Sequence, residues 1–415
     1  MSKQKAVIFF TVLVDAIGIG IVIPVLPFYV ASFGSSAFLV TSLFAIFSFC
    51  SFLSTPLLGV LSDKYGRRPI LIASIFSTSL GWFVFAGAFH TIFLFVGRII
   101  DGIAAGNFST AQSYLIDIAK TPKEKTHNIG LIGAAFGLGF ILGPMLGGFL
   151  SPISPSFPFW FVGFLALGNG ALAVFLLNES NPKVLANSHK KIKFSFKELA
   201  RKEALKDFNP FLPIYRAIKN KPFYKNFSVW FLFNLATVSM QSIMALYVAS
   251  IFGFGSVTVG MLMAMIGIII VLNQAVFLKR FWLKYFSEKN LEFWLLLLLG
   301  IGFLLMVVPI LLWFIIGLVF ITFAQAVLRM VITSNVSNKS KTDNQGEIIG
   351  VLSSLGAVAS IVGPLIAGAM FEIKVSFPFF LSASYGFLAF LILLSVYSKN
   401  KNKKYLARNT KQRAS

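Results

Sequence analysis

Long apolar stretches separated by short polar connections dominate the chain between residues 6 and 397. A helix needs about 20 apolar residues to cross the hydrocarbon core of a bilayer. The pattern therefore predicts twelve membrane-spanning helices near 6–30, 37–61, 69–89, 92–117, 127–150, 156–177, 226–251, 256–278, 293–312, 313–337, 346–370 and 375–397. The first stretch contains Asp15 and is too long for the apolar core of a cleavable signal peptide.

The composition supports a membrane protein. Of the 415 residues 57% are hydrophobic and only 12% are charged, whereas soluble domains carry roughly 25% charged residues. A soluble fold of this length could not bury so much apolar surface, but lipid-facing helices can stay apolar all round. We therefore expect an all-α membrane protein.

Positive charge is confined to one set of connections. With 36 Lys and Arg against 14 Asp and Glu, the formal net charge is +22. All but three of the Lys and Arg lie at the two termini, in a central linker or in alternate loops. The positive-inside rule then places both termini and the linker in the cytoplasm. No nucleic-acid recognition motif accompanies the charge, so nucleic acid is not expected as a partner.

The predicted spans divide the chain into two six-helix bundles. The expected boundaries are 1–177 for the first bundle, 178–225 for a basic linker, 226–397 for the second bundle and 398–415 for a disordered basic tail. The linker mixes Lys with several Phe residues. It is interpreted either as a solvated tether or as an amphipathic helix on the membrane lipids.

An internal repeat relates the two halves. The stretch GLIGAAFGLGFILGPMLGG begins at Gly130, and GVLSSLGAVASIVGPLIAG begins at Gly350. The pair Gly143-Pro144 thus recurs as Gly363-Pro364 at an offset of 220. Parallel repeats of six helices are typical of secondary transporters, with a solute site between the halves.

Three ionisable residues lie within the spans of the first half. Asp15 and Asp101 fall near the middle of the first and fourth spans, and Arg98 precedes Asp101 by one turn. A charge at mid-bilayer costs at least about 2.5–3.5 kcal/mol, so such residues are usually functional. We expect Asp15 or Asp101 to bind a transported proton, with Arg98 adjusting its affinity. The alternative is a static Arg98–Asp101 pair that holds the helix in place.

Several motifs resemble those of the major facilitator superfamily. The loop after the second span reads GVLSDKYGRRP from Gly59, the first span contains DAIGIGIVIPVLP from Asp15, and the fourth contains GRIIDGIAAGN from Gly97. A further stretch, NQGEIIG, begins at Asn344. The chain most resembles the proton-coupled drug antiporters of the tetracycline-resistance type. This resemblance implies the major facilitator fold, with two pseudo-symmetric six-helix bundles.

The resemblance also implies two functional motifs. The gating motif consists of Gly59, Asp63, Gly66, Arg67, Arg68 and Asp117. In the family, the aspartate at the Asp63 position faces the start of the eleventh helix, where a helix dipole stabilises an anion. Gly59 and Gly66 are expected to permit a tight turn and close helix approach. The antiporter motif consists of Gly143, Pro144, Gly147 and Gly148; plain small-residue packing is the alternative.

Polar and aromatic residues in other spans are candidates for a substrate cavity. They are Asn107, Gln112, Trp230, Asn234, Gln241, Asn273, Gln325 and Arg329. Hydrogen bonds and aromatic contacts from such residues are typical of ligand sites. Interhelical hydrogen bonding is an equally good interpretation, and Arg329 can instead extend to the membrane surface.

The chain departs from the tetracycline exporters at their acidic positions. Gly81 occupies the place of their acidic residue in the third span, and 295–312 in the ninth span contains no acid. Conversely, Asp101 stands where those exporters have a small neutral residue. The proton-binding carboxylate is therefore expected to have moved, and tetracycline is not the expected substrate.

The predicted function is proton-coupled antiport of small amphipathic organic compounds by alternating access. A proton symporter importing a nutrient such as a nucleoside, an amino acid or a carboxylate is the alternative, and a non-transporting sensor is a remote one. No catalytic constellation or phosphate-binding motif is present, so neither an enzyme nor a cofactor is expected. One cysteine and three scattered histidines predict no metal site. We expect a monomer, multi-pass in a bacterial inner membrane.

Overall fold

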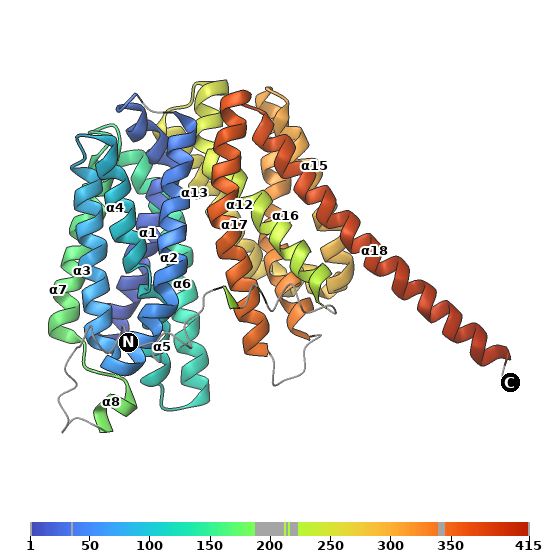
Figure 1. Ribbon diagram of the computed structural model, residues 1–415, viewed down its shortest axis with the longest axis horizontal. Helices are drawn as coiled ribbons and strands as arrows, with labels where there is room; N and C mark the ends of the chain where they lie inside the picture. The colour runs from blue at the N-terminus through green and yellow to red at the C-terminus, as the bar shows by residue number, and fades with distance from the viewer. Residues whose placement is uncertain are drawn as a thin grey trace. The chain divides into compact units, whose positions relative to one another are not determined.

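The computed structural model describes residues 2–34, 36–186, 211–212, 215, 223–338 and 345–413. Within these residues the chain is helical and contains no β-strand. Twelve segments of the described residues are long and apolar enough to cross a membrane. The predicted all-α membrane fold with twelve spans is confirmed (Figure 1).

The first six spans are formed by seven helices. A short helix follows them. Their bounds are α1 (Lys3–Ala31), α2 (Ala37–Tyr65), α3 (Arg67–Ala86), α4 (Thr91–Ala104), α5 (Asn107–Asp117), α6 (Pro122–Leu150), α7 (Phe157–Leu176) and α8 (Pro182–Ala186).

The other six spans follow the linker. Their bounds are α12 (Tyr224–Phe252), α13 (Ser256–Leu272), the π-helix η1 (Asn273–Trp282), α14 (Leu283–Tyr285), α15 (Glu288–Val307), α16 (Leu311–Asn338), α17 (Gln345–Ile373) and α18 (Phe377–Arg413).

The structure corrects the predicted spans in three places. The fourth span is two helices, α4 and α5, and not one. The eighth continues through η1 and α14 to Tyr285. The ninth begins earlier than predicted, because Ser287 caps α15 by accepting a hydrogen bond from the Asn290 amide at 3.3 Å. α18 continues to Arg413, so the predicted disorder of the tail is not confirmed.

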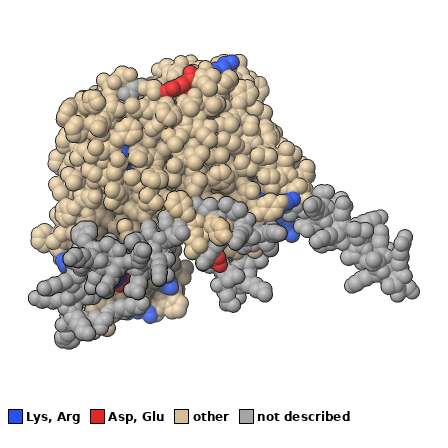
Figure 2. All heavy atoms as spheres, in the orientation of Figure 1, with Lys and Arg blue, Asp and Glu red and all other residues tan. Residues whose placement is uncertain are grey.

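The chain forms two compact units. The first comprises 1–210 with 242–268, and the second comprises 211–241 with 269–415. Most of the predicted linker, 178–225, lies outside the described residues, and its boundaries stay predictions. Figure 2 shows one face on which uncharged residues dominate and described charged residues gather mostly near its two ends. This distribution suits a protein whose middle contacts lipid.

In the first unit, α1 packs against α6, and α3 packs against both α4 and α7 (Figure 1). An aromatic core joins α1, α3 and α7. The Tyr29 hydroxyl donates to the backbone oxygens of Phe85 and Ala86 at 3.0 and 3.1 Å. The rings of Trp82 and Phe159 stack with centroids 5.9 Å apart. This core fixes α3, which carries part of the candidate site.

The repeated glycines make equivalent contacts in the two units. A Cβ at Gly143 of α6 would lie 2.7 Å from the backbone oxygen of Ile17 in α1. A Cβ at Gly363 of α17 would lie 3.1 Å from Ser239 Oγ in α12. Small residues thus let the fifth span approach the first, and the eleventh approach the seventh. The repeat in the sequence therefore corresponds to a repeated packing of helices.

Candidate functional site

An intramembrane polar cluster lies inside the first unit. We define it as five residues from α1, α3, α4 and α5: Asp15, Thr78, Arg98, Asp101 and Asn107. All but Asp15 are buried. Buried polar groups are costly unless they are hydrogen-bonded, so each contact in this cluster matters.

Arg98 and Asp101 form the charged part of the cluster. Arg98 Nη1 lies 3.0 Å from Asp101 Oδ2, as their i,i+3 spacing predicts. The guanidinium carbon also lies 4.3 Å from the centre of the Phe47 ring and 5.5 Å from that of Trp82. Two aromatic faces and one carboxylate therefore stabilise this buried cation.

Asp15 has a different environment. Asn107 Nδ2 donates to Asp15 Oδ1 and to Thr78 Oγ1, both at 3.4 Å. Among the described residues Asp15 forms no ion pair, and the charge of Asp101 acts on it. Asn107 Oδ1 and Arg98 Nε are buried and have no hydrogen-bond partner within the described part of the chain. The cluster therefore keeps unused hydrogen-bonding capacity.

The fourth span is interrupted between the two parts of the cluster. α4 ends at Ala104 and α5 begins at Asn107. A helix end leaves backbone groups without intrahelical partners. Broken membrane helices often supply such groups to ion and substrate sites. The sequence predicts one continuous helix here, so this break is a feature that sequence reasoning missed.

Gly81 of α3 packs closely against α4. A Cβ at Gly81 would lie 2.9 Å from the backbone nitrogen of Asp101. Any side chain at this position would push α4 away from α3. The carboxylate on α4 and the glycine on α3 thus belong to one packing arrangement. The proton-binding role of Asp101 stays a prediction.

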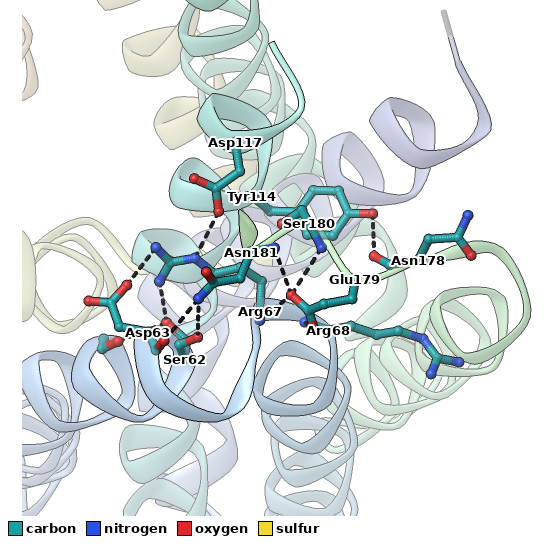
Figure 3. Close-up of polar contacts among 11 residues, drawn as sticks. Ser62, Asp63, Arg67, Arg68, Tyr114, Asp117, Asn178, Glu179, Ser180 and Asn181 are labelled. Carbon is teal, nitrogen blue, oxygen red and sulfur yellow. Dashed lines mark hydrogen bonds and ion pairs between the residues drawn. The ribbon is translucent and has the colours of Figure 1, made fainter. Parts of the chain in front are cut away.

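The gating motif brings Arg67 between two helices. Its guanidinium contacts Asp63 Oδ1 at 2.6 Å through Nη2, and Asp117 Oδ2 at 3.1 Å through Nε (Figure 3). Arg67 Nη1 also donates to Ser62 Oγ at 2.6 Å. The end of α2, the start of α3 and the end of α5 are therefore joined. We call Ser62, Asp63, Arg67 and Asp117 the turn cluster.

The two glycines of the motif differ. Gly66 has φ 108°, a conformation that favours glycine, at the turn between α2 and α3. A Cβ at Gly59 would meet nothing within 4 Å among the described residues. Gly59 lies inside α2, and the close helix approach expected there stays a prediction. Arg68 Nη2 donates to the Val174 oxygen at 2.8 Å.

Sequence reasoning missed the residues that complete this turn. Glu179 and Asn181, just after α7, contact the ends of α3 and α2 (Figure 3). Glu179 stands 112 residues from Arg67, and no local pattern announces the contact. The available signal was an acidic residue directly after an apolar span.

The antiporter motif packs on two neighbours within the first unit. Gly143 approaches α1, and a Cβ at Gly147 would lie 3.0 Å from Val25 Cγ2 of the same helix. A Cβ at Gly148 would lie 3.1 Å from the Ser256 oxygen at the start of α13. Pro144 lies inside α6. These contacts match the small-residue packing that the sequence indicates.

Comparison with known proteins places the chain in a family. The family model described as Major Facilitator Superfamily matches residues 8–289 and 275–414. The chain belongs to this superfamily. It is 28% identical to the quinolone resistance protein NorA of Staphylococcus aureus (strain MSSA476) over 395 residues, covering 95% of this chain and 96% of the relative. It is also 28% identical to the class H tetracycline resistance protein of Pasteurella multocida, covering 91% of each.

Solved structures share the fold. The human organic anion transporter MFSD10 (TETRAN) superposes with a TM-score of 0.66 at 23% identity, covering 94% of this chain and 99% of that one. The peptide transporter POT with sulfate gives 0.76 at 14% identity, covering 96% and 95%. As a member of this superfamily, the chain is a multi-pass membrane transporter and not an enzyme.

In this superfamily chain, the cavity residues predicted in the second half lie in helix contacts. Trp230 Nε1 donates to the Leu352 oxygen of α17 at 2.7 Å, and Asn234 Nδ2 donates to the Trp230 oxygen at 2.8 Å. Asn273 Oδ1, at the start of η1, accepts from Trp282 Nε1 at 2.9 Å. Interhelical and local hydrogen bonding therefore occupies these groups.

The remaining candidates are less enclosed. Gln112, Gln241 and Gln325 are half-buried, and Arg329 is exposed. A substrate role stays a prediction for all eight candidates. Asn107 is the one that the structure brings to the intramembrane polar cluster.

The ninth span contains an acid that the predicted bounds excluded. Glu292 is buried in α15, and its Oε2 accepts from Asn335 Nδ2 of α16 at 2.7 Å. Glu292 lies one residue before the predicted span, which begins at residue 293. The second unit therefore holds a buried carboxylate after all, at the α15–α16 contact.

Proposed function

We propose that this superfamily member is a proton-coupled antiporter that exports small amphipathic organic compounds by alternating access. The observation that carries the proposal is the intramembrane polar cluster. It places two carboxylates and one arginine on two spans of the first unit, the first and the fourth, with Asn107 in contact with Asp15. Charges inside spans persist where transport of ions or protons requires them.

The two carboxylates have different partners. This arrangement suits a cycle in which one carboxylate is ionised while the other is protonated. Asp101 pairs with Arg98, whereas Asp15 is held by the neutral amide of Asn107. Two nearby carboxylates resist being charged together. In the proposed cycle, a proton enters on Asp15 or Asp101, and Arg98 shifts its interactions accordingly. The residue that carries the proton is one of these two.

The direction of transport rests on the relatives and on the antiporter motif. The two related proteins are named for resistance to quinolones and to tetracycline. Gly143, Pro144, Gly147 and Gly148 match the motif that exporters carry. We further propose an inner-membrane location with both termini in the cytoplasm, because Lys and Arg concentrate in those connections.

The test is proton movement in proteoliposomes that enclose a pH-sensitive dye. A proton gradient is imposed, and cationic drugs, quinolones, tetracyclines and nutrients are added in turn. We expect proton movement opposite to the solute for at least one amphipathic drug. The substitutions Asp15→Asn and Asp101→Asn should each be compared with Glu124→Gln, because Glu124 at the start of α6 lies outside the intramembrane polar cluster and outside both motifs.

Three outcomes separate the alternatives. Loss of coupled proton flow in one of the two cluster variants, with solute binding retained, supports antiport and identifies the proton carrier. Proton movement in the same direction as a nutrient would establish the symporter instead. Coupled flow that survives both cluster substitutions would show that these aspartates are structural.

A further inference from the structure

The carboxylate of Glu179 lies at the N-terminus of α3 (Figure 3). Its Oε1 accepts hydrogen bonds from the backbone nitrogens of Arg67, Ser180 and Asn181 at 2.8, 3.0 and 2.9 Å. Its Oε2 accepts from the Arg68 nitrogen at 3.2 Å. Four backbone donors from two distant segments therefore converge on one anion.

This contact supplies a helix cap that α3 lacks locally. The residue before α3 is Gly66, which has no side chain and makes no side-chain cap. The first amide groups of a helix have no intrahelical partners, and an anion there also interacts favourably with the helix dipole. Hydrogen bonds to an ionised acceptor are about twice as strong as neutral ones. Glu179 provides both effects from beyond α7.

Gly66 makes room for this carboxylate. A Cβ at position 66 would overlap Glu179 Oε2. The glycine of the gating motif therefore meets two demands at once: its φ of 108° and the space that Glu179 occupies. A tight turn alone explains only the first demand.

The short segment that contains Glu179 also contacts the end of α2. Asn181 Nδ2 donates to the backbone oxygens of Asp63 at 2.9 Å and Ser62 at 3.4 Å, at the end of α2. The Tyr114 hydroxyl of α5 donates to the Asn178 oxygen at 2.8 Å. The segment 178–181 thus joins α2, α3 and α5, the three helices that contribute to the turn cluster.

We propose that Glu179 is a positioning residue of the gating turn. It holds the backbone of Arg67, while Asp63, Asp117 and Ser62 hold the guanidinium. When the Glu179 charge is removed, the first turn of α3 loses its cap, and Arg67 is no longer held at the distance that its ion pairs need. This role lies outside the recognised motif and goes beyond the proposed function, since it holds for any transported solute.

Amide hydrogen exchange on the purified full chain tests the contact directly. We expect the amides of Arg67 and Arg68 to exchange about tenfold faster in Glu179→Gln, because local opening becomes easier. The matched control is Glu124→Gln. Glu124 also accepts from a backbone amide, that of Lys120 at 2.9 Å, and pairs with Lys5 at 2.6 Å, but at the start of α6.

Glu124→Gln should leave exchange at Arg67 and Arg68 unchanged. Unchanged protection of these two amides in Glu179→Gln would overturn the proposal. This measurement needs no transported compound, so it is independent of whether antiport occurs.

A kinetic measurement separates positioning from simple capping. It uses the compound that gives the largest proton signal in the proteoliposome panel. Glu179→Gln should lower the turnover several-fold with KM unchanged, and Glu179→Asp should recover part of it, because the charge returns on a shorter side chain. The thermal unfolding midpoints of Glu179→Gln and Glu124→Gln should be similar. Wild-type turnover in Glu179→Gln, despite faster exchange, would reduce Glu179 to a local cap and overturn the positioning role.

Discussion

The contact between α3 and α4 and the contact between α15 and α16 are built alike but differ in chemistry. A Cβ at Gly97 would lie 2.8 Å from the Gly81 oxygen, and a Cβ at Gly317 would lie 2.5 Å from the Gly302 oxygen. Both helix pairs therefore approach through facing glycines. At the repeat offset of 220, however, Arg98 and Asp101 correspond to Leu318 and Ile321.

This difference bears on what the Arg98–Asp101 pair does. Leu318 and Ile321 are buried, at 3% and 0% exposure, and complete the α15–α16 contact without any charge at these two positions. The packing of such a helix pair therefore does not require an ion pair there. A buried pair also contributes little net stability compared with apolar residues of similar size. The comparison favours a functional role for Arg98 and Asp101 over a static one.

The largest expected effect comes from giving the α3–α4 contact the apolar residues that the α15–α16 contact has. The double substitution Arg98→Leu with Asp101→Ile should keep the thermal unfolding midpoint, or raise the stability by about 1–4 kcal/mol, since no buried charge is left unpaired. Coupled proton flow in proteoliposomes should fall to the level of protein-free liposomes. If the folded double variant still shows coupled proton flow, the role of the Arg98–Asp101 pair is structural.

A smaller effect is expected from filling the glycine contacts. Gly81→Ala should destabilise the protein by about 1–3 kcal/mol through overpacking, because its Cβ would meet the Asp101 backbone. Gly302→Ala should destabilise it similarly, since its Cβ would lie 3.0 Å from the Gly317 oxygen. Only Gly81→Ala should also reduce coupled flow per folded molecule. Equal transport in the two variants would contradict the link between Gly81 and Asp101.

The repeated Gly-Pro motifs offer a finer test. Gly143→Ala should cost about 1–3 kcal/mol, because the new methyl group meets backbone of α1. Gly363→Ala should cost less, because its nearest neighbour is the Ser239 hydroxyl, a side-chain atom that can move. Thermal unfolding of both variants measures the difference. A larger loss at Gly363 would show that the Ser239 contact of α17 is less able to adjust than the backbone contact of α6, contrary to this expectation.

The smallest expected effect concerns the aromatic neighbours of Arg98. Phe47→Leu should weaken the cation–π contact by about 0.5–2 kcal/mol and lower the unfolding midpoint by a few degrees. Phe83→Leu is the control, because that ring contacts Trp160 and Phe164. If the two losses in midpoint are the same, the Phe47 ring contributes packing alone.

Much of the fold follows from local pattern, and much of the site does not. The twelve spans and the common face of Arg98 and Asp101 were predictable, because apolar length and helical periodicity are properties of neighbouring residues. The break between α4 and α5 is not predicted, although Gly106 and Asn107 stand at it, because the length of an apolar stretch indicates a span and not an interruption within it. The start of α15 lies ahead of the predicted bound because Ser287 caps the helix before its apolar stretch begins.

The sequence by itself determined that this chain spans a membrane in two related halves, which half carries Arg98 and Asp101, and which turn carries the gating motif. These properties follow from hydrophobicity, charge and short motifs along the chain. Only the tertiary structure decided that Asn107 contacts Asp15, that Gly81 makes room for Asp101, and that Glu179 caps α3. These contacts join residues that are distant in sequence, so they depend on how the helices pack and not on any local preference.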